Sequence, residues 1–169
     1  MACGKWSRSI SLHWNKGEES LKKGKIAGMA ILLLLLAVLG YAFLGSPAEW
    51  YRRRALRQAM AEVEDGEVTL NEIIPFAWDS VYSFGPYTTQ EQMEEIMGIS
   101  ARRLEESPSE GMVQLVFVNG GQIVCGICGY ISKEGYSVSF DEKINFADNV
   151  VFRAKRDADG ILWLTEPHD

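Results

Sequence analysis

The sequence predicts an α+β protein in which an N-terminal transmembrane helix precedes a small domain with an antiparallel sheet packed on one or two helices. Three observations indicate this fold: a run of 19 residues without a charge, an Asn-Gly turn between two apolar strands, and the order of a strand, a helix and then a meander of strands. The expected divisions are a basic cytoplasmic tail (1–25), the transmembrane helix (26–45), a juxtamembrane helix (46–66) and a small acidic domain (67–169).

The charge-free run covers residues 26–44. As a helix it rises about 28 Å, close to the thickness of the hydrocarbon core. A cleaved signal peptide is the alternative, since Ser46-Pro47-Ala48 offers small residues, but the run is longer than a usual signal sequence and the tail before it is long. We expect a retained anchor in the plasma membrane, with a cytoplasmic N-terminus and an extracytoplasmic domain, because six basic residues precede the run and four follow it.

The helix after the run is expected over residues 47–63, a stretch rich in helix formers with Pro47 in its first turn and Gly66 beyond its end. Its basic side chains are candidates for contact with lipid phosphates, next to two aromatic residues that favour the interface: Arg52, Arg53, Arg54 and Arg57. A solvated helix that spaces the domain from the bilayer is the alternative.

The two parts of the chain carry opposite charge. Residues 1–57 hold ten Lys or Arg and three acidic residues, a net charge of +7, whereas residues 58–169 hold seven and twenty, a net charge of −13. Phosphate backbones repel a domain of that charge, so we expect no nucleic-acid partner. The expected partners are the lipid bilayer and an unknown protein or cell-envelope component.

An aromatic stripe follows Pro75, where Phe76, Trp78, Tyr82 and Phe84 alternate along one predicted strand. Such a stripe is more typical of a core than of a ligand site, so we expect Phe76, Trp78 and Tyr82 to be largely buried.

A helix is expected after the capping-box spacing Thr88-Thr-Gln-Glu91, with Met93, Ile96 and Met97 on one side and Gly98 as a left-handed stop. Its acidic residues are more typical of a solvated face than of a cation site. A second helical stretch is expected over residues 100–106.

The strongest local pattern in the domain is a hairpin of residues 112–118 and 122–131. Asn119-Gly120 supplies the positive φ angles that a tight turn needs. Shorter strands are expected at 136–140, 149–155 and 161–165, the last two joined through residues 157–160.

The motif Cys125-Gly-Ile-Cys128 is the one candidate for catalysis. A redox pair of thioredoxin type lies at a helix start, whereas this pair falls within a predicted strand. Cysteines three apart on a strand are separated by about 10 Å and point to opposite faces, too far for a disulfide. Free thiols buried as small apolar groups are therefore favoured over a redox pair or a metal site, and no catalytic residue, metal or cofactor is expected.

The segment WDSVYSFGPYT (residues 78–88), followed by LVFVNGG (residues 115–121), resembles a group of small uncharacterised bacterial proteins. These are lipoprotein-like or membrane-anchored and share the pattern W-D-x-V-Y-x-F-x-P-Y-T before a short acidic helix. The resemblance covers residues 70–165 and implies an extracytoplasmic α+β domain, without an activity or catalytic residues. This chain departs by having no lipobox, and the C-x-x-C pair is not constant in the group.

These features favour a surface-tethered, non-enzymatic binding or interaction module. Two alternatives stay open: a membrane-tethered thiol-redox enzyme that uses Cys125 and Cys128, and an accessory subunit of a membrane complex.

Overall fold

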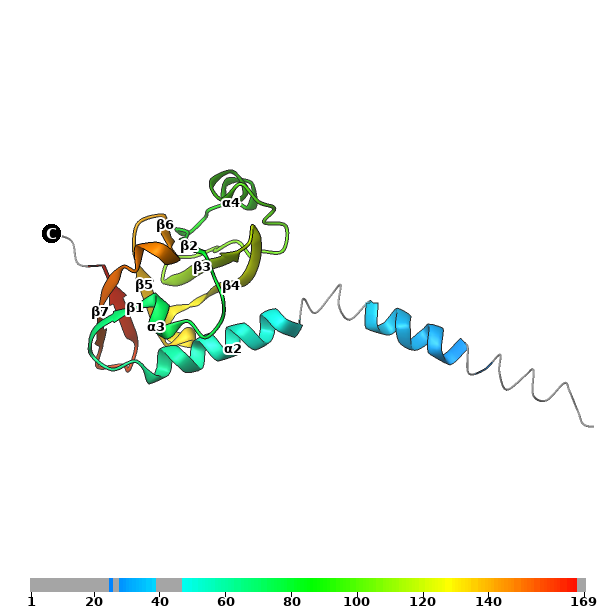
Figure 1. Ribbon diagram of the computed structural model, residues 1–169, viewed down its shortest axis with the longest axis horizontal. Coiled ribbons are helices and arrows are strands. Elements are labelled where there is room, and N and C mark those ends of the chain that lie inside the picture. Colours follow the sequence, from blue (N-terminus) through cyan, green and yellow to red (C-terminus); the bar gives the residue numbers. More distant parts are fainter. Residues whose placement is uncertain (1–24, 26–27, 39–46, 167–169) are drawn as a thin grey trace, which may run out of the picture. The chain divides into compact units, whose positions relative to one another are not determined.

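The computed structural model describes residues 25, 28–38 and 47–166 (Figure 1). The chain divides into two compact units, Met1–Gly45 and Ser46–Asp169. In the first unit the described residues are helical, and their side chains are all exposed. The second unit contains every described strand.

The described part of the chain contains no helix that is both long and apolar enough to cross a membrane. The predicted transmembrane helix, and with it the single-pass localisation in the plasma membrane, is therefore wrong for these residues. A crossing needs about 20 consecutive apolar helical residues, whereas the described helix of the first unit covers residues 28–38. The rest of the predicted span, residues 26, 27 and 39–45, and the predicted tail up to residue 24 lie outside the described residues.

The second unit is an α+β domain, as predicted. Its elements are α2 (Pro47–Glu62), β1 (Gly66–Thr69), α3 (Leu70–Ile73), β2 (Ser80–Ser83), α4 (Gln90–Met97), β3 (Met112–Asn119), β4 (Gln122–Tyr130), α5 (Ile131–Glu134), β5 (Tyr136–Ser139), β6 (Lys143–Asn145), the 3-10 helix η1 (Phe146–Asp148), β7 (Val151–Arg156) and β8 (Leu162–Thr165).

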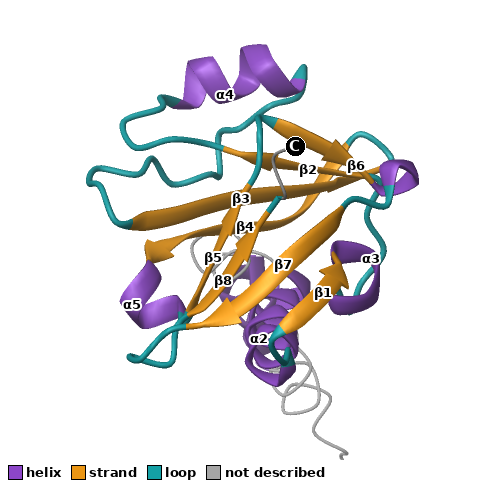
Figure 2. Ribbon diagram, turned by 90° about the vertical axis from the view of Figure 1, so that its left-hand side faces the viewer, coloured by secondary structure: helices purple, strands orange, loops and turns teal. Residues whose placement is uncertain are grey.

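The strands form two four-stranded sheets rather than the single sheet that was predicted. Sheet 1 has the order β1-β7-β8-β5 and sheet 2 the order β4-β3-β2-β6. The pairs are antiparallel except β5 and β8, which run parallel. Figure 2 shows α4 above sheet 2, and sheet 1 on the other side of it.

Two hydrophobic cores follow from this layering. The first core lies between the sheets and includes Leu115 and Phe117 of β3. The second core lies on the other face of sheet 2, under α4, and includes Val116 and Val118. Strand β3 is buried on both faces, which explains its nearly continuous apolar sequence.

The aromatic stripe is divided between these cores, so the prediction of one shared strand face is wrong. Phe76 and Trp78 precede β2 and pack on Phe117 of the first core, with ring centroids 5.4 and 6.1 Å away. Tyr82 and Phe84 lie in the second core. Side chains alternate between the two faces of a strand only from Ser80, where β2 begins. Phe76 and Trp78 lie before this strand, so they need not share a face with Tyr82 and Phe84. The predicted burial of Trp78 and Tyr82 is confirmed, whereas Phe76 is half-buried.

The predicted acidic helix is confirmed as α4, with Gly98 in the left-handed conformation at its end. Its cap is Thr89 paired with Gln92, one residue later than predicted. Residues 100–106, predicted as helix, form an irregular loop. Side chains bind this loop's backbone instead: Glu94 accepts from the Ala101 N–H at 2.8 Å, and Gln114 donates to the Glu105 carbonyl at 2.8 Å.

The predicted hairpin is confirmed as β3 and β4. Asn119 pairs with Gln122, so the two residues of positive φ are Gly120 and Gly121 rather than Asn119 and Gly120. A register shift after Phe117 leaves Val124 as a bulge on β4. The bulge lies on the edge strand of sheet 2, where α2 packs.

Candidate functional site

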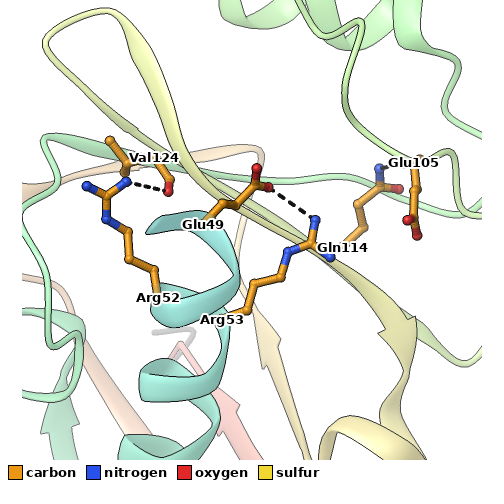
Figure 3. Close-up of polar contacts among 6 residues, drawn as sticks. All are labelled: Glu49, Arg52, Arg53, Glu105, Gln114 and Val124. Carbon is orange, nitrogen blue, oxygen red and sulfur yellow. Dashed lines mark hydrogen bonds and ion pairs between the residues drawn. The ribbon is translucent and has the colours of Figure 1, made fainter. Parts of the chain in front are cut away.

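Helix α2 lies against β4, the edge strand of sheet 2, and is held there by buried and polar contacts. Leu56 and Met60 enter the first core. Arg52 Nη1 donates a hydrogen bond of 3.0 Å to the carbonyl of the bulged Val124 (Figure 3). A cationic side chain thus binds a carbonyl that has no strand partner on that side.

A second arginine of α2 lies over β4 close to Gly126. Arg53 Nη2 donates to Glu49 Oε1 at 3.2 Å (Figure 3). A Cβ atom at Gly126 would lie 3.8 Å from that nitrogen and 2.7 Å from Leu104 Cδ2. The glycine therefore makes room for Leu104 beneath the ion pair.

Two polar atoms near this ion pair are buried and lack a hydrogen-bond partner within the described residues: Arg53 Nε and Gln114 Oε1. Gln114 is only 3% exposed and uses its Nε2 for the Glu105 carbonyl. Arg53 Nε is thus a buried donor, and Gln114 Oε1 a buried acceptor, without a partner among the described residues.

Arg57, one turn further along α2, binds Glu134 of α5. Its Nη2 and Nε lie 2.7 and 3.2 Å from Glu134 Oε2. A Cβ atom at Gly129 would lie 2.6 Å from Glu134 Oε1, so this glycine leaves space for the carboxylate. Both glycines of the Cys-Gly-Ile-Cys-Gly stretch thus have a packing role.

The four predicted arginines therefore differ in what they do. Arg52, Arg53 and Arg57 bind protein groups, whereas Arg54 is exposed and stacks over the Trp50 ring, 5.8 Å from its centroid. Within the described residues no carboxylate pairs with Arg54. The contact of these arginines with lipid phosphates stays a prediction.

The outward side of α2 forms an open depression of about 660 Å³, which we call the aromatic–basic face. It is lined by Trp50, Arg53, Arg54, Arg57, Gln58 and Ala61. Trp50 is 62% exposed, and its neighbour Tyr51 is 69% exposed. Sequence reasoning named the arginines but missed Gln58 and Ala61, although their spacing from Trp50 and Arg54 repeats at about one helical turn.

Cys125 and Cys128 lie on β4, as predicted, and both are free. Cys125 belongs to the first core, whereas Cys128 pairs in register with Gln114, whose side chain reaches Met93 of the second core. They therefore face opposite sides of sheet 2. Burial raises the pKa of Cys125 to about 12 and also raises the pKa of Cys128, chiefly by desolvation. Neither thiol is activated.

The remaining candidates for chemistry are few. No group of three or more His, Cys, Asp or Glu side chains within residues 25, 28–38 and 47–166 is placed to hold a metal ion. Both histidines, His13 and His168, lie outside the described residues. The Tyr136 hydroxyl is buried in the first core without a hydrogen-bond partner among the described groups, and burial holds its pKa above the usual range.

No family model, curated protein or solved structure matches this chain. The resemblance to small bacterial extracytoplasmic proteins therefore stays a prediction.

Proposed function

We propose that the protein is a non-enzymatic binding module that receives an acidic protein surface on the aromatic–basic face of α2. The observation that carries this proposal is the exposed pair of Trp50 and Arg54, with the arginine stacked on the ring. Tryptophan and arginine are enriched among the residues that contribute most to protein interfaces. A singly exposed aromatic residue is common, but here it lies in an open depression.

The contacts of α2 supply a rigid support for this face. The helix is fixed to β4 through Arg52 and to α5 through Arg57, and Leu56 is fully buried beneath it. Side chains on a helix held in this way lose little further freedom when a partner binds. Preorganisation of this kind favours affinity.

The charge of the face selects the class of partner. The depression is lined by three arginines and no carboxylate. Of these three arginines, Arg53 and Arg57 pair with glutamates, whereas Arg54 is exposed and has no carboxylate partner within the described residues. An acidic partner surface would pair with it and would also be attracted during encounter. The thiol-redox alternative gains no support from this geometry, because the two thiols lie on opposite faces and have raised pKa values.

Photo-cross-linking in the cells that make the full chain tests the proposal. A benzophenone amino acid replaces Gln58, which lines the face, and in a matched control replaces Trp163, an exposed residue of β8 in sheet 1. We expect an adduct with one acidic protein from position 58 and none of that protein from position 163. Arg54→Glu in the same chain should lower the adduct yield about tenfold, while Arg54→Lys should largely preserve it. Equal yields of this adduct from positions 58 and 163, or a yield that Arg54→Glu does not change, would contradict the proposal.

A further inference from the structure

Tyr87 has a backbone conformation that its side chain does not favour. Its φ is +67°, in the left-handed region where Gly and Asn are the usual residues. Its N–H donates to the Ser107 carbonyl at 2.7 Å, so the backbone of Tyr87, and not its side chain, makes this contact. The side chain is 64% exposed and makes no ring contact or hydrogen bond with other described residues. A strained position that keeps an exposed aromatic ring points to a contact with another molecule.

Helix α4, which begins three residues later, presents an acidic and partly apolar outer side. Met93 and Met97 fix the helix to the second core. On the opposite side Glu91 and Glu95 are exposed, and Ile96, predicted on the side of the two methionines, is 41% exposed at the flank of the helix. Neither carboxylate pairs with a cation of the described residues. Tyr87, Glu91, Glu95 and Ile96 together are called the acidic face below.

We propose that the acidic face of one chain docks on the aromatic–basic face of α2 in a second copy. This inference rests on the proposed function and names its acidic partner. Opposite charges meet in this arrangement, Arg54 against Glu91 and Glu95, and each face adds exposed apolar groups, Trp50 on one side and Tyr87 with Ile96 on the other.

The two faces cannot meet within one molecule. Figures 1 and 2 show α4 and α2 at opposite ends of the domain, with the sheets between them. Each chain therefore offers both faces at once, and the contact is head-to-tail. Such contacts lead to rings or open chains rather than to a symmetric dimer.

Sedimentation velocity of the purified full chain over a range of protein concentrations tests this inference. We expect species larger than a dimer at high concentration, which dissociate as salt is raised. Arg54→Glu and Glu95→Arg should each weaken association at least about tenfold, because each places like charges together. The double variant carrying both reversals should restore it. Asp141→Arg, at an exposed loop position, is the matched control and should leave association unchanged.

Tyr87→Gly separates a contact role from a structural one. Glycine adopts the same φ without strain, so the melting temperature should stay equal or rise, while association weakens. A chain that stays monomeric at every concentration, association that survives both single reversals, or a double variant that is not restored would overturn the inference. A monomeric chain that still gives the position 58 adduct with another acidic protein would overturn this inference alone and leave the proposed function standing.

Discussion

The carboxylate of Asp79 accepts a hydrogen bond of 2.6 Å from the backbone N–H of Gly120, 41 positions further along the chain. Its other oxygen accepts from the Ser80 hydroxyl at 3.0 Å. The residue that precedes β2 thus holds the turn between β3 and β4, in the glycine pair where both φ angles are positive.

Asp79→Ala should destabilise the domain by about 1–2 kcal/mol, because the turn loses a charge-assisted hydrogen bond in a partly exposed place. Asp79→Asn keeps an acceptor oxygen and should cost less. Urea unfolding of the full chain measures both. Asp141→Ala, at an exposed loop position, is the control and should change stability by less than about 0.5 kcal/mol. An Asp79→Ala domain as stable as this control would show that the hydrogen bond between Asp79 and Gly120 does not stabilise the turn.

Gly126→Ala should destabilise the domain by about 1–3 kcal/mol, since the new methyl group would lie 2.7 Å from Leu104 Cδ2. The clash is with the end of a flexible side chain, so Gly126→Ala should cost less in a chain that already carries Leu104→Ala, although Leu104→Ala is itself destabilising because Leu104 is buried in the second core. A double-mutant cycle measures this coupling. Gly85→Ala, where nothing lies within 4 Å of the added atom, should be nearly neutral. Simple additivity of the two changes would contradict the packing role assigned to Gly126.

Stability should fall with alkaline pH through the Cys125 thiol. Burial raises its pKa from 9.0 to about 12, so between these values the folded chain keeps a proton that the unfolded chain has lost. The stabilising contribution is complete below pH 9 and is lost as the pH rises towards 12, which amounts to about 1 kcal/mol at pH 10. Denaturation at pH 8 and pH 10 should show a smaller difference for Cys125→Ala than for the unchanged chain. Identical differences would mean that the thiol titrates normally in the folded state.

Trp78→Ala should destabilise the domain by about 3–5 kcal/mol, as a large-to-small change in the first core. Trp78 is 5% exposed and makes edge contacts with Phe117 and with Phe146, whose ring lies 5.2 Å away. Thermal unfolding checks the loss, and Tyr51→Ala, at a 69% exposed position of α2, is the control and should leave stability nearly unchanged. If the Trp78→Ala chain kept its melting temperature but lost the position 58 adduct, the residue would belong to a binding surface.

Local signals in the sequence predicted local structure well. The hairpin, α4 with its glycine stop, and the strand that carries both cysteines depend on residues close together in the chain. The division of the strands into two sheets was not predicted, for two reasons. Strand β3 is buried on both faces and therefore shows no alternation, and the parallel pair of β5 and β8 is not joined by a tight turn that the sequence could show.

The candidate site was only half predictable for a related reason. The sequence showed a cluster of arginines on one helix, but their partners lie far along the chain: Val124 is 72 positions from Arg52, and Glu134 is 77 positions from Arg57. Charge alone could not separate Arg52 and Arg57, which hold the helix in place, from Arg54, which does not. The sequence also does not show the packing role of Gly126, since the side chain that fills the space beside it, Leu104, lies in a separate segment of the chain.

The pairing of β1 with β7 has a consequence for synthesis of the chain. Thr69 of β1 lies opposite Val151 of β7, so 82 further residues must be synthesised before β1 can pair with its neighbour in sheet 1. At a synthesis rate of about 5–20 residues per second, this interval lasts about 4–16 s on the ribosome. During this time the growing chain carries a strand without a partner and an apolar face of sheet 2 without its cover. A chaperone that holds extended segments has its window of action in those seconds, before β7 and β8 are made.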